Sequence, residues 1–143
     1  MTKNVPTYQK NSITLELANK LIAASEKKAH EIGVPMVTAI VDESGNLKAL
    51  SRMDGAPLLA NKIAQDKAYT AVGFGMPTEE WYPFIKDDPP LMVGAPHIDR
   101  IVVFGGGIPV QVNEEIVGGI GVSGGHYSQD IECAKEALKI IDA

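Results

Sequence analysis

Hydrophobic positions recur at helical spacing in three long stretches of the chain. Residues 13–32 carry apolar side chains at every third or fourth position and end at Gly33 and Pro35, which are residues that stop helices. Residues 58–73 are rich in alanine, and residues 127–142 again place apolar side chains along one helical row. The pattern therefore predicts three helices, at the beginning, middle and end of the chain.

Shorter apolar stretches separated by turn residues have the character of β-strands. The turns are short, so strands that follow each other pair antiparallel, because a parallel pair needs a long crossover. Helices and antiparallel strands in this order predict an α+β fold in a single domain spanning residues 1–143, with a five-stranded antiparallel sheet flanked by helices. The expected strands are 36–42, 47–52, 101–104, 108–112 and 116–122.

The segment between the second helix and the third expected strand contains both a helix-start signal and a stretch without periodicity. Thr78 stands before two glutamates and is a candidate N-cap of a short helix. Residues 86–97 have no period and contain three prolines, which predicts an irregular lid, binding loop or interface segment. The aromatic residues Trp81, Tyr82 and Phe84 either cover the core or form part of a subunit contact.

Composition narrows the class of protein. The net charge is −5 and no run of basic residues occurs, which argues against a nucleic-acid partner and against an anionic membrane surface. The first twelve residues are polar and no apolar stretch approaches the ~20 residues of a membrane helix, so neither a signal peptide nor a membrane span is expected. The single cysteine, Cys133, fits a reducing compartment, and a cytoplasmic location is expected.

Residues 119–124 match the pattern G-x-G-x-x-G between a strand and a helix. A dinucleotide site also needs a following strand and an acidic residue about 20 positions on, and the chain ends too soon for both. No Lys-Ser/Thr pair follows, so it is no P-loop. Two interpretations remain: an anion such as a carboxylate, phosphate or haem propionate at the start of the last helix, or a tight turn without a ligand. Glycine within a strand, as at Gly121, marks close approach of a ligand or of another backbone.

The three histidines lack the close spacing of a metal site on one helix. His30 lies late in the first helix, where a cation favours the helix dipole, and His97 lies in the irregular loop. His126 begins the last helix beside the glycines, where a neutral imidazole is suited to act as a base or a ligand.

Charged residues at two further places are candidates for ligand binding. Arg52, Met53 and Asp54 close the expected hairpin, where they either bind a polar ligand or fix the loop through an Arg52–Asp54 salt bridge. Lys67 lies on the alanine-rich helix, and it either extends out of the core or meets a buried carboxylate or the acid group of a ligand.

Several of these segments together resemble the GlcG/HbpS family, in the right order over residues 13–142. The resemblance implies a profilin/PAS-like α+β fold and a homo-oligomer. Members include haem-binding proteins, a haem-binding domain fused to a cobalamin adenosyltransferase, and proteins of catabolic operons. The matching segments are Val41-Asp42 with Gly45, residues 52–56 (RMDGA), 67–71 (KAYTA), 105–109 (GGGIP) and 118–124 (GGIGVSG), and Asp130.

The first hypothesis is a small-molecule binding protein that holds haem or a related tetrapyrrole. Family members that ligate iron are similar in using a histidine in or near the first helix, which points to His30, with Met53 and Met92 as alternatives because haem iron also accepts thioethers. Arg52 and Lys67 would be the cationic partners of the propionates. The expected binding surface comprises Gly105, Gly106, Gly107, Gly121, Ser123 and Gly124, where missing side chains would leave space for the ligand.

Two alternatives belong to other classes of function. An enzyme of small organic acid or aromatic catabolism would hold the carboxylate with Arg52 or Lys67, while His126, Asp54 or Asp130 acts as acid or base. A non-catalytic assembly subunit would bind no ligand at all.

Overall fold

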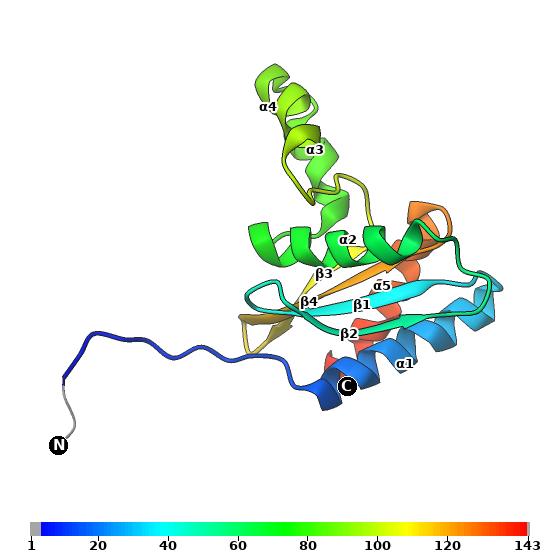
Figure 1. Cartoon of the computed structure of the whole chain (residues 1–143), viewed down its shortest axis with the longest axis horizontal. Coiled ribbons are helices and arrows are strands. Elements are labelled where there is room, and N and C mark those ends of the chain that lie inside the picture. The colour runs from blue at the N-terminus through cyan, green and yellow to red at the C-terminus, as the bar shows by residue number, and fades with distance from the viewer. Residues whose placement is uncertain (1–3, 143) are drawn as a thin grey trace.

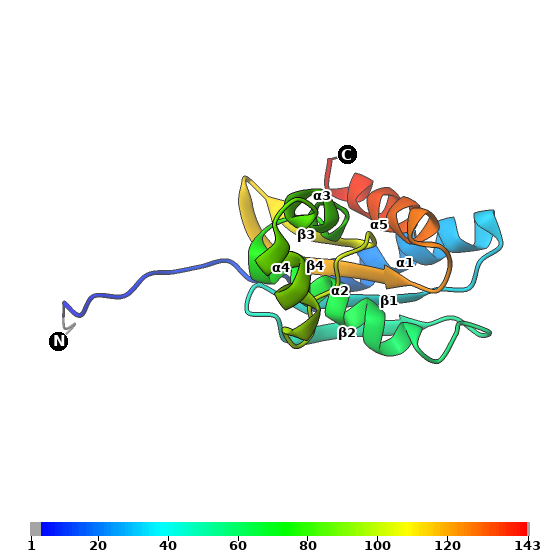
Figure 2. The same cartoon turned by 90° about the horizontal axis from the view of Figure 1, so that it is seen from above.

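An antiparallel sheet of four strands lies between two layers of helix in the computed structural model, which describes residues 4–142 (Figures 1 and 2). The predicted domain limits of 1 and 143 lie outside that part. Helix α2 covers one face of the sheet, and helices α1 and α5 cover the other. The strands are β1 (Val37–Asp42), β2 (Leu47–Arg52), β3 (Gly107–Val112) and β4 (Glu115–Ser123), in the order β2-β1-β4-β3. The long helices are α1 (Leu15–Ile32), α2 (Ala60–Phe74) and α5 (Tyr127–Asp142).

The prediction of an α+β fold is confirmed, but the prediction of five strands is wrong. Residues 101–104 have strand-like composition and form no strand. The amide of Val102 donates to the side-chain hydroxyl of Thr70, at 3.1 Å, instead of to a neighbouring strand. Arg100 just before it has a φ of 68°, and three glycines follow, so the backbone turns on both sides of the segment.

Local sequence signals explain the elements that do form. Helix α1 begins where the Thr14 hydroxyl accepts a hydrogen bond from the amide of Leu17, and it ends at Gly33, whose φ of 72° is left-handed. The β1–β2 hairpin turns at Asp42, whose carboxylate accepts from the amides of Ser44 and Asn46. The predicted antiparallel hairpin is therefore confirmed.

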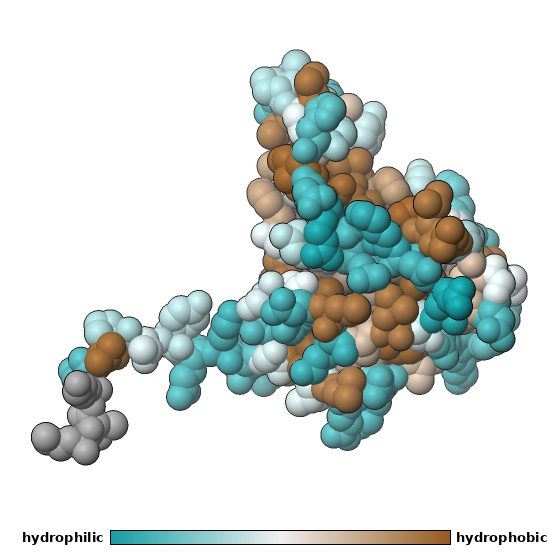
Figure 3. Space-filling model, viewed as in Figure 1, coloured by the Kyte–Doolittle hydropathy of each residue, from teal (hydrophilic) through white to brown (hydrophobic). Residues whose placement is uncertain are grey.

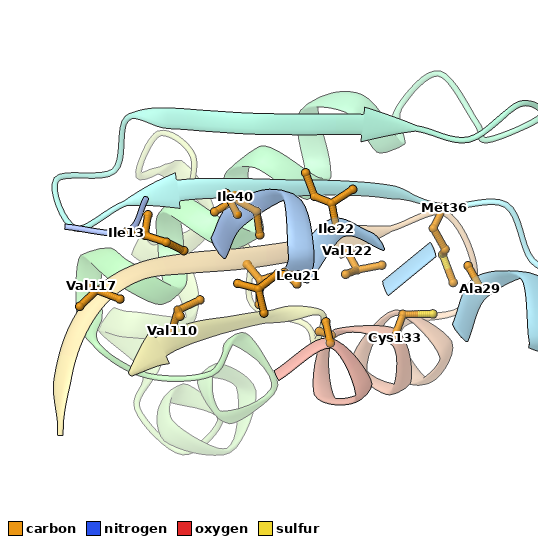
Figure 4. Packing of buried hydrophobic residues seen from close by; sticks show 14 residues of the cluster. Ile13, Leu21, Ile22, Ala29, Met36, Ile40, Val110, Val117, Val122 and Cys133 are labelled. Atoms are coloured by element: carbon orange, nitrogen blue, oxygen red, sulfur yellow. The ribbon is translucent and has the colours of Figure 1, made fainter. Parts of the chain in front are cut away.

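The main core lies between the sheet and the α1/α5 layer (Figure 4). Leu21 and Ile22 of α1 and Cys133 of α5 pack there against the sheet residues Ile40 and Ile120. A smaller cluster on the other face joins β1 to the alanines of α2. No helix among residues 4–142 is long and apolar enough to cross a membrane.

Residues 78–97 form an arm that projects from the end of α2 (Figure 1). Here two predictions are wrong. The Thr78 hydroxyl accepts from the amide of Gly107 rather than capping a helix, because the side chain is buried against the glycine turn. The supposed loop contains helix α4, whose N-cap is Asp88 and whose first residues are prolines. The arm comprises the turns η1 (Thr78–Glu80) and η2 (Ala95–His97) and the helices α3 (Trp81–Ile85) and α4 (Pro89–Gly94).

The aromatic residues of the arm differ in burial, and a role in a subunit contact stays a prediction. Trp81 is buried with Ile85 and Ala95 in a cluster of the arm itself. Tyr82 and Phe84 are more than half exposed.

Helix α2 lies unusually close to β4 because glycines of the strand face its backbone. A Cβ atom on Gly121 would overlap the carbonyl of Ala64 and lie 2.6 Å from the amide nitrogen of Ala68. A Cβ on Gly119 would lie 2.8 Å from the carbonyl oxygen of Ala68. The glycines of this strand therefore admit another backbone, which is one of the two interpretations that the sequence left open.

This contact predicts a large difference between two glycine-to-alanine substitutions. Gly121→Ala should destabilise the fold by about 3 kcal/mol or more, since the added methyl group meets backbone that cannot rotate away. Gly73→Ala in α2, where nothing lies within 4 Å of the added atom, should stabilise by about 0.5–1 kcal/mol. Urea unfolding followed by circular dichroism measures both, and equal stabilities of the two variants would contradict the packing described.

Candidate functional site

The glycine turn before β3 is filled by the chain's own atoms. Gly106 has a φ of 128°, and a Cβ there would lie 2.6 Å from Nζ of Lys67. A Cβ on Gly107 would lie 2.7 Å from the carbonyl carbon of Lys67, and one on Gly105 would overlap the side chain of Ile131. Close packing of α2 and α5 on the turn accounts for all three glycines, and Gly105 also lines the apolar hollow beside the arm.

The start of α5 is likewise enclosed by its own chain. The amide of Gly125 donates to Oδ1 of Asp130 at 3.1 Å, and the amide of His126 donates to Oε1 of Gln129 at 3.0 Å. The amide of Ser128 donates to Nδ1 of His126 at 3.2 Å. The side chains of the first turn therefore satisfy these helix-start donors, which an external anion would otherwise bind.

The remaining candidates of this region lie at the end of β4, beside the start of β1. Ser123 is buried and pairs with Val37. A Cβ on Gly124 would lie 2.5 Å from the carbonyl oxygen of Pro35. The structure thus places both residues against neighbouring backbone.

Lys67 and Asp130 form an ion pair in the interior. Nζ of Lys67 donates to Oδ2 of Asp130 at 2.7 Å and to the carbonyl oxygen of Val122 at 3.0 Å, and the two side chains are 0% and 3% exposed. The pair joins α2, β4 and α5 at one point. Of the two roles expected for Lys67, the structure shows the meeting with a buried carboxylate.

Burial acts on both charges of this pair. It lowers the pKa of the Lys67 ammonium, which the carboxylate of Asp130 opposes. It raises the pKa of the Asp130 carboxyl, which Lys67 and the amide of Gly125 oppose. Each group therefore holds the other in its charged form, and both charges are already paired within the interior.

An apolar hollow of about 450 Å³ lies outside this pair, between the arm and α5. Phe104 forms part of its wall, and Nζ of Lys67 lies 5.2 Å from the centre of the Phe104 ring. Tyr82 and Tyr127 complete the aromatic lining, and both are about half exposed. No local sequence signal marks Phe104 or Tyr127, because only the fold brings them together.

A second group of candidate residues lies at the C-terminal end of α1. His30 lines two adjoining hollows, of about 260 Å³ and 290 Å³, together with Met53 and Asp54. Arg52 lines the second of them, and no ion pair joins it to Asp54 within residues 4–142. Sulfur Sδ of Met53 accepts a hydrogen bond from the amide of Met36 at 3.3 Å. The structure therefore brings His30 beside the residues that close the β1–β2 hairpin.

The other candidates lie apart from this group. His126 is exposed, stacks on Tyr127 with ring centres 4.1 Å apart, and shares a hydrogen bond with the Ser128 hydroxyl. His97 and Met92 are exposed on the arm. Cys133 is buried, which raises the pKa of its thiol to about 11. In the described part of the chain no three His, Cys, Asp or Glu side chains gather as a metal site.

Fold and hollows together define an α+β protein with ligand-sized depressions at its rim. The family model described as "Haem degrading protein HbpS-like" matches residues 13–139, and this chain belongs to that family. A 15.0 kDa protein of Citrobacter freundii, from the dhaT-dhaS intergenic region, is 41% identical over 128 residues, covering 89% of this chain and 90% of the relative.

Two solved structures are similar along almost the whole chain. The crystal structure of Klebsiella pneumoniae protein ORFY superposes with a TM-score of 0.91 at 36% identity, covering 99% of each chain. The crystal structure of a PduOC:heme complex superposes with a TM-score of 0.83 at 29% identity, covering 92% of this chain and 96% of the other. The resemblance to haem-binding relatives is therefore confirmed at the level of the family.

The buried pair predicts that removing one charge is far more costly than removing an exposed one. Lys67→Met should destabilise by about 3–5 kcal/mol, since it leaves the Asp130 carboxylate buried without its partner. Lys135→Met, which breaks a pair with Glu79 on the surface, should cost less than about 1 kcal/mol. Urea unfolding at neutral pH measures both, and similar losses would contradict the role of the interior pair.

The same variant should show a characteristic dependence on pH. Without Lys67, burial raises the pKa of Asp130 further above its ordinary value, so the folded state favours the protonated carboxyl. The stability that this proton contributes is present at acidic pH and is lost as the pH rises through the folded pKa. The deficit of Lys67→Met relative to the original chain should therefore grow as the pH rises from about 4, the ordinary pKa of an aspartate, to neutral pH. A constant deficit over that range would speak against a buried, unpaired carboxyl.

Proposed function

We propose that this protein binds haem or a related tetrapyrrole at the two adjoining hollows beside His30, in an assembly of several copies. The observation that carries the proposal is the meeting of an exposed imidazole and an exposed guanidinium at one place, from elements distant in the sequence. Membership of a family whose model is described as haem-degrading and HbpS-like, and a similar domain solved with haem, support it.

The residues present suit the parts of such a ligand. The His30 imidazole has no hydrogen-bond partner within residues 4–142, so a ring nitrogen is available to ligate iron. Arg52 likewise has no ion-pair partner among the described residues and suits a propionate. Ala29, Val34 and Pro35 line the first hollow and offer an apolar wall.

Bound haem would supply an iron centre able to bind oxygen or exchange electrons, and this chain would tune it through His30. Glu26 accepts a hydrogen bond from the Ser51 hydroxyl and lies in the same hollow as Arg52. That hydrogen bond ties α1 to β2 and so holds the imidazole and guanidinium at a fixed separation. Met53 is engaged by the Met36 amide, so His30 is the better candidate for the iron ligand.

A single copy offers this ligand only part of an enclosure. The two hollows hold about 260 Å³ and 290 Å³, whereas pockets for small molecules usually hold roughly 300–1,000 Å³. Apolar side chains near the hairpin are also uncovered, with Leu58 and Leu59 79% and 73% exposed. A second copy of the chain that covers this rim would bury those side chains and close the site, which supports the homo-oligomer that the family resemblance implies.

The enzyme alternative has no comparable observation behind it. Asp130 is consumed in the interior pair, His126 lies on the surface near Tyr127, and Asp54 lines the hollow of His30. No two of these three groups line the same hollow.

Titration with haemin tests the proposal. The original chain should shift and sharpen the Soret band, and His30→Ala should lose that shift because the iron loses its nitrogen ligand. His126→Ala, which removes an exposed imidazole at the start of α5, should retain the band and serves as the matched control. Arg52→Gln should weaken affinity about tenfold while keeping the band position, since only the propionate contact is lost.

Native mass spectrometry of the same samples should show haem bound to a multimer rather than to a single chain. A free-haemin spectrum with the original chain, or an unchanged band in His30→Ala, would overturn the assignment.

A further inference from the structure

A fourth hollow lies beside helix α2, apart from the apolar hollow beside the arm and from the two hollows of His30. It holds about 580 Å³ and is bounded by the β1–β2 turn, one side of α2, and the segment that returns from the arm. Hydrophilic residues gather over α2 on the face seen in Figure 3. The residues that line the hollow are Gly45, Asn46, Leu47, Asn61, Lys62, Gln65, Asp66, Asp99 and Arg100. None of them lines the hollows of His30.

Arg100 is fixed in this hollow by several independent contacts. Its Nε donates to Oδ1 of Asp66 at 2.9 Å, and its guanidinium carbon lies 3.9 Å from the centre of the Tyr69 ring. Its carbonyl oxygen accepts from the Thr70 hydroxyl at 2.8 Å, although its φ of 68° is unfavourable for a residue with a side chain. The fold thus holds one guanidinium in a strained backbone position and a defined orientation.

Two kinds of hydrogen-bonding capacity are left open there. The terminal Nη atoms of Arg100 have no partner within residues 4–142, and the side chain is 33% exposed. Asn61 lies on α2, N-terminal to Asp66. Its Oδ1 is shielded from solvent and accepts no hydrogen bond among the described residues. The hollow therefore offers donors in a planar fork, and a rotation of the Asn61 side chain toward the hollow would add an acceptor that lacks a donor.

Complementarity to these groups defines a ligand class. A carboxylate matches the fork of the Arg100 Nη atoms in shape and charge. A hydroxyl or ammonium group on the same molecule would donate to Oδ1 of Asn61. We propose that this hollow binds a small hydroxy- or amino-carboxylic acid.

The charges of the hollow also limit the size of the anion. Asp66 already accepts from Arg100 and Lys62, so one ion-pair network of two cations and one carboxylate remains singly positive. Asp99 adds a negative charge to the rim. Lys62, Arg100, Asp66 and Asp99 therefore sum to zero charge, so a single carboxylate is bound through the Arg100 fork itself, and the hollow has no excess positive charge for a multiply charged phosphate. The acidic rim favours an ammonium or hydroxyl group on the ligand.

Four small molecules of nearly one size test this on the unaltered chain. Lactate and alanine carry both required groups, propanoate lacks the donor, and propane-1,2-diol lacks the carboxylate. NMR titration of the backbone amides and of the arginine Nε–Hε signals measures each affinity. Lactate or alanine should bind about tenfold more tightly than either control. The shifts should map to residues 45–47, 61–66 and 99–100, together with the Arg100 side chain.

The two arginines of the chain supply matched variants. Arg100→Lys should weaken binding of the preferred acid about tenfold, because a lysine ammonium cannot present the fork. Asn61→Ala should remove most of the preference over propanoate. Arg52→Lys, the same change in the other hollow, should alter the affinity less than twofold. Thermal unfolding of each variant checks that the fold is retained, and the comparison of the four molecules holds without any variant.

Three results would overturn the inference: equal binding of lactate, alanine and propanoate, shifts centred on His30, or an affinity that follows Arg52 rather than Arg100. Haem binding at the His30 hollows is measured separately by the Soret band, so failure of one site leaves the other intact.

Discussion

The close approach of helix α2 to strand β4 fixes the positions of the other elements around the sheet. Gly119 and Gly121 allow the helix backbone to lie directly on the strand, where any side chain would collide with Ala64 or Ala68. At that distance Lys67 reaches across the sheet layer to the Val122 carbonyl and to Asp130 of α5. Without the glycines, the ammonium would be buried without its partner, at a cost far above that of an exposed charge. Packing and ion pair therefore require each other.

A consequence is that the glycine-rich interior is part of the core. The space beside Gly106 and Gly107 is taken by Lys67, and the amides at the start of α5 are bonded to the first turn's own side chains. The space that remains for a ligand lies at the rim, where helix ends and hairpin ends meet. The depressions there include an aromatic one beside the arm, a histidine-bearing one at the end of α1, and a polar one beside α2.

The two arginines show how one residue type serves different purposes. Arg52 ends an edge strand, where it has no ion-pair partner among the described residues and is free to meet an approaching ligand. Arg100 is held by Asp66, Tyr69 and Thr70 and presents only its outer nitrogens. A free guanidinium adapts to its partner, whereas a fixed one selects for shape and donor pattern. In the two proposals, haem meets the free guanidinium of Arg52, whereas the small hydroxy- or amino-carboxylic acid meets the fixed guanidinium of Arg100.

The three long helices and the hairpin could be predicted from the sequence, because capping residues, turns and apolar periods act over neighbouring positions. The family could be predicted as well, because its matching segments are read directly from the sequence. The sequence left open whether Lys67 meets a carboxylate, and the fold decided that. The prediction of a strand at residues 101–104 is wrong, although their composition suits a strand. The Thr70 hydroxyl binds the Val102 amide, and the backbone turns at Arg100 and at the following glycines. The meetings of His30 with Arg52 and of Arg100 with Asn61 arise only when distant elements pack, and no local pattern encodes such proximity.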